Sequence, residues 1–86
     1  MRRDAEFFGD MELPLIYIAK RLKDALALEK MLTEAGLDYL VETDTYRGGI
    51  IFASERVGAF FYVAAEQEQQ ARQAMLTHGW KPYASR

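Results

Sequence analysis

The sequence Ile16-Tyr17-Ile18-Ala19 has a close counterpart in Phe61-Tyr62-Val63-Ala64, and these two stretches decide the fold. Branched and aromatic residues dominate both, as is typical of β-strands. Each stretch leads into an amphipathic segment that closes at a glycine, Gly36 in the first half of the chain and Gly79 in the second. Two similar strand-helix-strand halves in one short chain predict the element order β-α-β-β-α-β of a split βαβ fold.

The boundaries of the elements follow from the spacing of apolar residues and from glycine and proline. We predict strands at residues 15–19, 39–43 and 59–64, helices from Lys20 to Ala35 and from Glu66 to His78, and a turn at residues 44–49 before a short apolar stretch at 50–52. The first helix should bury one apolar stripe, made of Leu22, Ala25, Leu26, Leu28, Met31, Leu32 and Ala35. Residues 1–13 are expected to form an N-terminal extension. Residues 14–86 should form one α+β domain of ferredoxin-like topology, with two helices on one face of an antiparallel sheet.

Size and charge restrict the class of protein. With 86 residues and a mass of 9.9 kDa, the chain has room for one domain. Eleven Lys and Arg against thirteen Asp and Glu give a net charge of −2, which argues against binding to a nucleic-acid backbone. The absence of cysteine excludes disulfides, thiolate zinc sites and cysteine nucleophiles. No stretch has the length and apolarity of a signal peptide or a membrane span, so we expect a cytoplasmic protein without membrane contact.

Several of these segments together resemble a known family. Tyr17-Ile18-Ala19 before a charged helix, Glu34-Ala35-Gly36-Leu37 running into a strand, and Phe61-Tyr62-Val63 before an acidic helix start are similar to small prokaryotic signal-transducing domains. That family is similar in fold to PII-like and ACT-like regulatory domains, and the resemblance covers residues 15–80. It implies a regulatory role and supplies no catalytic residue. The chain departs from the family pattern by residues 1–13 and by an insertion at residues 47–58.

The inventory of reactive side chains argues against an enzyme. His78 is the only histidine, the only serines are Ser54 and Ser85, and asparagine is absent. His78 stands just before a helix-ending glycine, where an imidazole stabilises free carbonyl groups. The carboxylates Asp38, Glu42 and Asp44 are spread along one strand and its turn without a histidine nearby. We therefore predict no catalytic residue, no metal site and no cofactor.

Aromatic residues give the strongest functional signal. Strict alternation along the two central strands places Tyr17, Phe60 and Tyr62 together on the face of the sheet that the helices leave open. An apolar face of this kind is rarely left in water. We predict that these three residues anchor a second copy of the chain or a protein partner. Two alternatives remain: coverage by the chain's own Phe7, Phe8 and Met11 or Trp80 and Tyr83, or stacking of single-stranded RNA bases, which the acidic composition disfavours.

A second possible binding site is cationic. Lys20, Arg21 and Lys23 fall in the first turn of the first helix, where they oppose the helix dipole and would attract an anion. Arg47, followed by two glycines, could present backbone amides to an anion, although the spacing of a phosphate-binding loop is absent. The alternative function is therefore sensing of a small anionic ligand by Lys20, Arg21 and Arg47.

Overall fold

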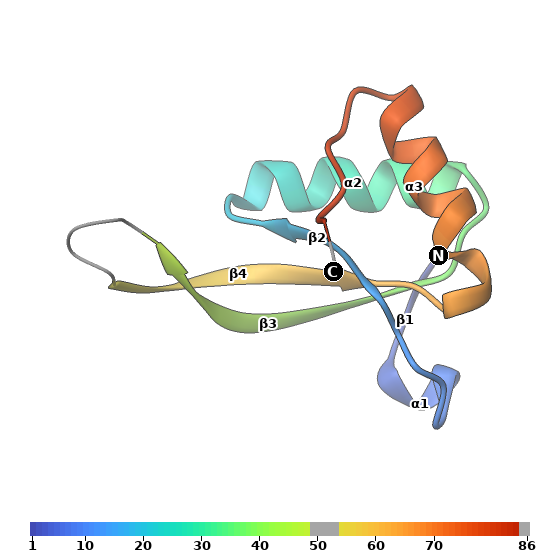
Figure 1. Ribbon diagram of the computed structural model, residues 1–86, viewed down its shortest axis with the longest axis horizontal. Coiled ribbons are helices and arrows are strands. Elements are labelled where there is room, and N and C mark those ends of the chain that lie inside the picture. Colours follow the sequence, from blue (N-terminus) through green and yellow to red (C-terminus); the bar gives the residue numbers. More distant parts are fainter. Residues whose placement is uncertain (49–53, 85–86) are drawn as a thin grey trace.

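The computed structural model describes residues 1–48 and 54–84, apart from the side chains at positions 46, 47, 54 and 55 (Figure 1). The described elements are β1 (Arg2–Arg3), α1 (Ala5–Phe8), β2 (Leu15–Ala19), α2 (Leu22–Glu34), β3 (Tyr39–Gly48), β4 (Ser54–Tyr62), the 3-10 turn η1 (Ala65–Gln67) and α3 (Glu68–Thr77). The apolar stretch predicted at residues 50–52 lies outside the described residues. Within the two described ranges, no helix is both long and apolar enough to cross a membrane.

The sheet has four strands in the order β1-β3-β4-β2. β4 runs antiparallel to both of its neighbours, whereas β1 lies parallel to β3. Helices α2 and α3 cover one face of the sheet, and the short α1 lies on the other side (Figure 1). These features confirm the predicted α+β class with two helices on one face. The expectation of a purely antiparallel sheet is wrong, because Arg2 and Arg3 from the predicted extension add β1 in parallel beside Tyr39 and Leu40.

The last strand of the predicted order is absent from the described residues after α3. The tail still lies along β2, because the Tyr83 amide donates a 2.7 Å hydrogen bond to the Ile16 carbonyl. The Arg72 guanidinium links the tail to β2, because it donates hydrogen bonds to the carbonyls of Leu15, at 3.2 Å, and Tyr83, at 2.6 Å. In the described residues the tail therefore meets β2 through this local contact and not through a ladder of paired residues.

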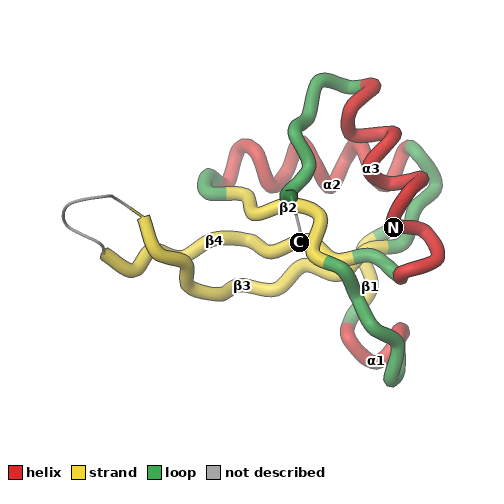
Figure 2. The backbone as a smooth tube through the Cα atoms, viewed as in Figure 1, coloured by secondary structure: helices red, strands yellow, loops and turns green. Residues whose placement is uncertain are grey.

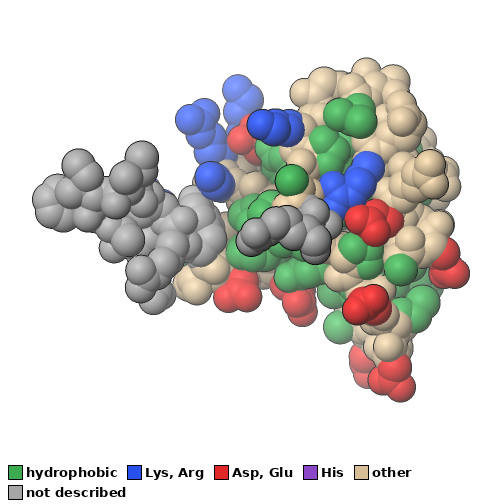
Figure 3. Space-filling model, in the orientation of Figure 1, with side chains coloured by type: hydrophobic (Ala, Val, Ile, Leu, Met, Phe, Trp, Pro, Cys, Tyr) green, Lys and Arg blue, Asp and Glu red, His purple; other side chains and the backbone are tan. Residues whose placement is uncertain are grey.

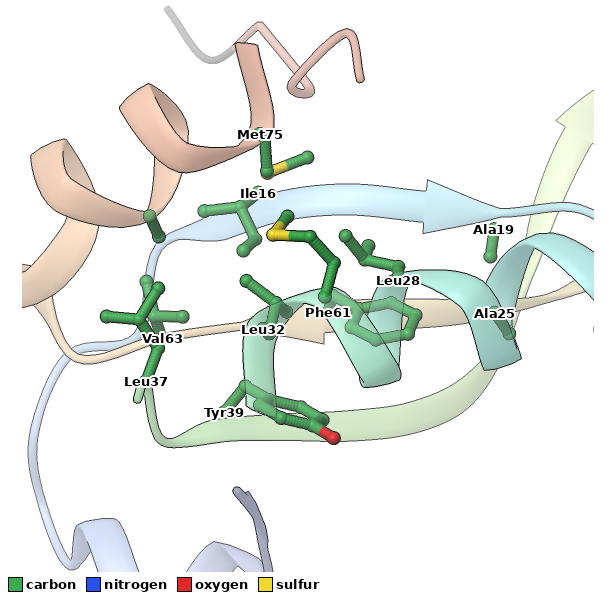
Figure 4. Close-up of a cluster of buried hydrophobic side chains, with 12 residues drawn as sticks. Ile16, Ala19, Ala25, Leu28, Leu32, Leu37, Tyr39, Phe61, Val63 and Met75 are labelled. Carbon is green, nitrogen blue, oxygen red and sulfur yellow. The ribbon is translucent and has the colours of Figure 1, made fainter. Parts of the chain in front are cut away.

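The core lies between the sheet and the two long helices (Figure 4). Its wholly buried apolar side chains come from both layers: Ile16, Leu28, Leu32, Leu37, Phe61, Val63, Ala71 and Met75. The rings of Tyr39 and Phe61 stack in this core with centroids 6.0 Å apart. The Tyr39 hydroxyl lies 3.1 Å from the Glu29 carbonyl, to which it donates, and 3.0 Å from the Thr33 hydroxyl, so its buried polar atom is satisfied by α2.

Both long helices end where the sequence indicates. Gly36 and Gly79 take the positive φ values of +77° and +84°, and the amides of Leu37 and Trp80 return to the carbonyls of Leu32 and Met75. This is the hydrogen-bond pattern that a left-handed glycine makes available after a helix. The predicted helix ends are thereby confirmed.

The β3–β4 hairpin is much longer than predicted. The segment at positions 44–48, predicted as a turn, continues β3, and β4 already begins at Ser54. Regular pairing extends from Leu40 opposite Tyr62 to Gly48 opposite Ser54. The outer half of this hairpin therefore projects beyond the helices as a two-stranded arm, comprising residues 44–48 and 54–58 (Figure 2).

Candidate functional site

Tyr17 does not lie on the open face of the sheet. The pairing of β2 with β4 shifts between Leu15 and Tyr17, and beyond this bulge Tyr17 stands opposite Phe61. Residues directly opposite each other in an antiparallel pair share a face, and Phe61 belongs to the core beneath the helices. The prediction that Tyr17 joins Phe60 and Tyr62 is wrong, because the extra residue of the bulge turns Tyr17 to the helix side.

Phe60 and Tyr62 do lie together on the open face. Phe60 stands opposite Ile18 and Glu42, and Tyr62 stands opposite Leu40. Burial raises the pKa of the Tyr62 phenol, and the nearby Glu42 and Asp44 carboxylates add to the rise. The open face is therefore acidic as well as aromatic, and the described strand side chains on it carry aromatic rings on β4 alone, whereas base stacking in RNA-recognition domains uses rings on two neighbouring strands.

The N-terminal segment covers one end of this open face. Phe8 is buried in a small cluster with Leu40 and Ala64, against which Leu13 and Tyr62 pack. Phe8, one of the residues considered from the sequence for covering this face, therefore covers part of it. Phe7 and Met11, predicted for the same role, remain exposed. Trp80 covers Tyr17 on the opposite, helix side of the sheet.

A cationic hollow lies between the start of α2 and the C-terminal tail. It has a volume of about 540 Å³, and its lining includes Tyr17, Lys20, Arg21, Asp24 and Lys81. Burial raises the pKa of the Tyr17 phenol, with a further contribution from the Asp24 carboxylate. The structure brings together two of the three residues predicted to bind an anion. Their companion Lys81 was missed, because only the folded tail that follows Trp80 brings it near α2.

The third residue of the predicted anion site, Arg47, is described only in its backbone. Its backbone belongs to β3 in the projecting arm, opposite Glu55, and its side chain is outside the description. The tight turn predicted to present its backbone amides to an anion is replaced by regular strand pairing. The predicted turn is therefore wrong, and the predicted anion contact of the Arg47 side chain lies outside the described residues.

An apolar groove lies where the arm leaves the body, beside the first turn of α2. We use this name for the hollow of about 200 Å³ lined by Ala19, Lys20, Arg21, Leu22, Ala25, Thr43, Val57, Gly58 and Ala59. Leu22 and Val57 at its margin are 74% and 63% exposed, and Leu26, one turn further along α2, is 57% exposed. Leu22 and Leu26 were predicted to be buried. They are exposed because they occupy the flank of the apolar stripe that turns away from the sheet, whereas Ala25 and Leu28 face it.

Among the remaining reactive groups, His78 has a structural contact. The His78 ring Nδ1 lies 2.9 Å from the Ala74 carbonyl at the end of α3, as expected for an imidazole that closes a helix. The side chain of Ser54 and the whole of Ser85 lie outside the description. In the described ranges, His, Asp and Glu form no group of three or more that could hold a metal ion.

Comparison of the chain with protein-family models, with curated proteins and with solved structures found no match.

Proposed function

We propose that this chain is a cytoplasmic, non-enzymatic regulatory domain of ferredoxin-like architecture that acts as a protein-interaction module, its first partner being a second copy of itself. Two features support the architecture: the strand neighbours β2-β4-β3, and the tail that returns from α3 to the edge of β2. The regulatory role extends the resemblance to small prokaryotic signal-transducing domains.

The observation that carries this proposal is the exposed apolar surface at the base of the arm. Leu22, Leu26 and Val57 are each more than half exposed. Single exposed apolar residues are ordinary, but three large ones beside a hollow with an alanine and glycine floor form a surface suited to an apolar partner. Burial of such side chains is the main favourable term in protein association.

The arm itself also favours association. In the described part of the chain, β1 pairs no further along β3 than Leu40, and β2 pairs no further along β4 than Ala59. Beyond these residues the arm has two strands with both edges unpaired in the sheet. A two-stranded ribbon is only marginally stable in water, and its unpaired edges are ready to pair with another chain.

Light scattering over at least a tenfold range of concentration tests the proposal. We expect the average mass to rise above 9.9 kDa as concentration increases. Leu26→Ser should reduce this rise. Leu76→Ser is the matched control, because Leu76 is 58% exposed on α3 and lies outside the groove. A mass that stays at the monomer value for the unaltered protein would overturn the proposal.

The cationic hollow supports a second candidate function, the sensing of a small anion. Tyr17, Arg21 and Lys81 meet there, and a hollow with a few convergent polar groups is the usual form of a ligand site. Trp80, the single tryptophan, contacts Tyr17 and so reports on this site. Inorganic phosphate or a nucleotide should raise the melting temperature and change the tryptophan fluorescence. Both effects should disappear in Arg21→Gln with Lys81→Gln and persist in Lys30→Gln; no effect in the unaltered protein would exclude this function.

A further inference from the structure

A compact acidic projection is formed by residues 4–12, which we call the N-terminal knob. Its sequence Asp-Ala-Glu-Phe-Phe-Gly-Asp-Met-Glu carries four carboxylates and no cation. The Asp4 carboxylate caps α1 by accepting a 3.1 Å hydrogen bond from the Phe7 amide. Phe8 anchors the knob to the sheet, while Phe7 and Met11 are each nearly half exposed. The knob therefore presents two apolar side chains beside its carboxylates, and the Arg3 guanidinium lies over the Phe7 ring, 4.5 Å from its centroid.

The carboxylates of the knob have no cationic partner within the described chain. Glu6, Asp10 and Glu12 form no ion pair with a described residue. Arg2 and Arg3 of β1 form ion pairs with Glu29 and Asp38 instead, and Arg3 contacts the knob only through the Phe7 ring. The knob's charge is thus available to an outside partner.

The apolar groove has the opposite character. Lys20 and Arg21 line it, and Lys23 follows in the first turn of α2. Arg21 and Lys23 form no ion pair within the described chain. The exposed Leu22, Leu26 and Val57 are consequently bordered by positive charge, whereas Met11 is flanked in the sequence by the Asp10 and Glu12 carboxylates. The two surfaces are complementary in both charge and apolar character.

The knob and the groove of one molecule cannot meet. α2 begins at the end of the sheet from which the arm projects, whereas α1 lies at the other end and on the opposite face (Figure 1). In the same view, Lys and Arg gather around the start of α2 and Asp and Glu around α1 (Figure 3). Complementary surfaces at opposite ends of one molecule favour a head-to-tail contact between copies.

We infer that the N-terminal knob of one copy docks into the apolar groove of the next. Phe7 and Met11 occupy the groove beside Leu22 and Val57, and the knob's carboxylates face Arg21 and Lys23. This inference rests on the proposed self-association and names the two surfaces that carry it. Because the contact is heterologous, two joined copies leave one knob and one groove unused, and assembly continues until a ring closes or a filament forms. Salt weakens the contact, because the charges at its margin are exposed.

Two charge-reversal variants test the inference by complementation. The first carries Arg21→Glu and Lys23→Glu in the groove, and the second carries Asp10→Lys and Glu12→Lys in the knob. All four positions are exposed, and acidic residues at the N-cap position and in the first turn of α2 suit the helix dipole, so the groove variant should fold normally. We expect each variant alone to self-associate about tenfold more weakly than the unaltered protein. An equimolar mixture should regain its mass in light scattering, because each variant's knob matches the other's groove.

The controls reverse the same charges elsewhere. Glu34→Lys with Glu66→Lys matches the knob variant, and Lys30→Glu matches a single change in the groove; both should associate like the unaltered protein. If both test variants keep the unaltered mass, or if their mixture fails to regain it, the inference is overturned while self-association through another surface stands. If the unaltered protein is a monomer at every concentration, both the inference and the proposed function fail.

Discussion

Trp80 packs edge-on against Tyr17, with ring centroids 5.3 Å apart and ring planes at 90°. Tyr17 belongs to β2, and Trp80 begins the tail that follows α3, so this contact joins the tail to the sheet. Both rings also pack against the main core. An edge-to-face pair of this kind adds to the stability gained from burial of the two rings.

Trp80→Ala should therefore lower the free energy of unfolding by about 2–3 kcal/mol. Denaturant unfolding followed by circular dichroism measures this value without relying on tryptophan fluorescence. Lys81→Ala, at the next and exposed position, should change the same free energy by less than about 0.5 kcal/mol. Equal effects of the two substitutions would show that the ring contact does not hold the tail.

Arg72→Gln should release the tail from the edge of β2. The guanidinium of Arg72 donates to two carbonyls and also forms a 2.9 Å ion pair with Glu68 in the preceding turn. Hydrogen exchange at the Tyr83 amide should accelerate in this variant. Glu68→Gln is the control, because it removes only the ion pair, worth about 0.3–0.5 kcal/mol on a helix, and should leave the Tyr83 amide protected. Unchanged exchange in Arg72→Gln would contradict the clamp.

The buried phenol of Tyr39 makes the free energy of unfolding depend on pH in the alkaline range. Burial raises the pKa of its phenol, and the nearby Glu29 carboxylate adds to the rise. A group whose pKa is higher in the folded state favours folding while it is protonated, so this contribution is complete below the ordinary tyrosine pKa of about 10 and is lost as the pH rises through the folded-state value.

The free energy of unfolding should consequently decrease above about pH 10. Absorbance at the tyrosinate band should show that unfolding and ionisation occur together. Tyr39→Phe should be less stable at neutral pH, because it loses the hydrogen bond to the Glu29 carbonyl, but its stability should decline less in alkali. Tyr83→Phe, at an exposed side chain, should follow the unaltered protein; the same alkaline decline in Tyr39→Phe would contradict this assignment.

Gly36→Ala should cost about 1 kcal/mol through backbone conformation alone. The φ of Gly36 is +77°, and a Cβ placed there would have no other atom within 4 Å. Gly36→Asn should cost less, because asparagine tolerates the left-handed region better than alanine does. Thermal unfolding of the two variants gives this order, and the reverse order would indicate that crowding rather than φ limits the position.

The local patterns of this sequence predict its helices and strands well, and the predictions that were wrong have physical causes. Glycine after an apolar stripe marks a helix end through one residue's conformation, so Gly36 and Gly79 could be recognised without a structure. Tyr17 could not be placed correctly, because a bulge at Leu15–Tyr17 depends on how β2 pairs with a strand more than forty positions away. Strict alternation then assigns the ring to the wrong face.

The candidate surfaces were harder to predict than the elements. Lys20 and Arg21 were identified from their position at a helix start, but Lys81 joins them only through the folded tail. Leu22 and Leu26 have the spacing of a buried stripe, and only the packed structure shows that α2 turns them outward. β1 was missed because two consecutive arginines carry no strand pattern, and the backbone of Tyr39 and Leu40 supplies the pairing.

The two edges of the sheet near the body are closed by opposite ends of the described chain. β1 covers the start of β3, and the backbone of Tyr83 covers part of β2. Unpaired strand edges are the usual starting points of aggregation, and these short segments prevent it by covering the backbone groups at the two edges. A shortened chain without Arg2 and Arg3, or without the tail beyond Gly79, would keep most of its core and yet expose a new edge. Removal of residues from either end would therefore reduce solubility even where the fold is kept.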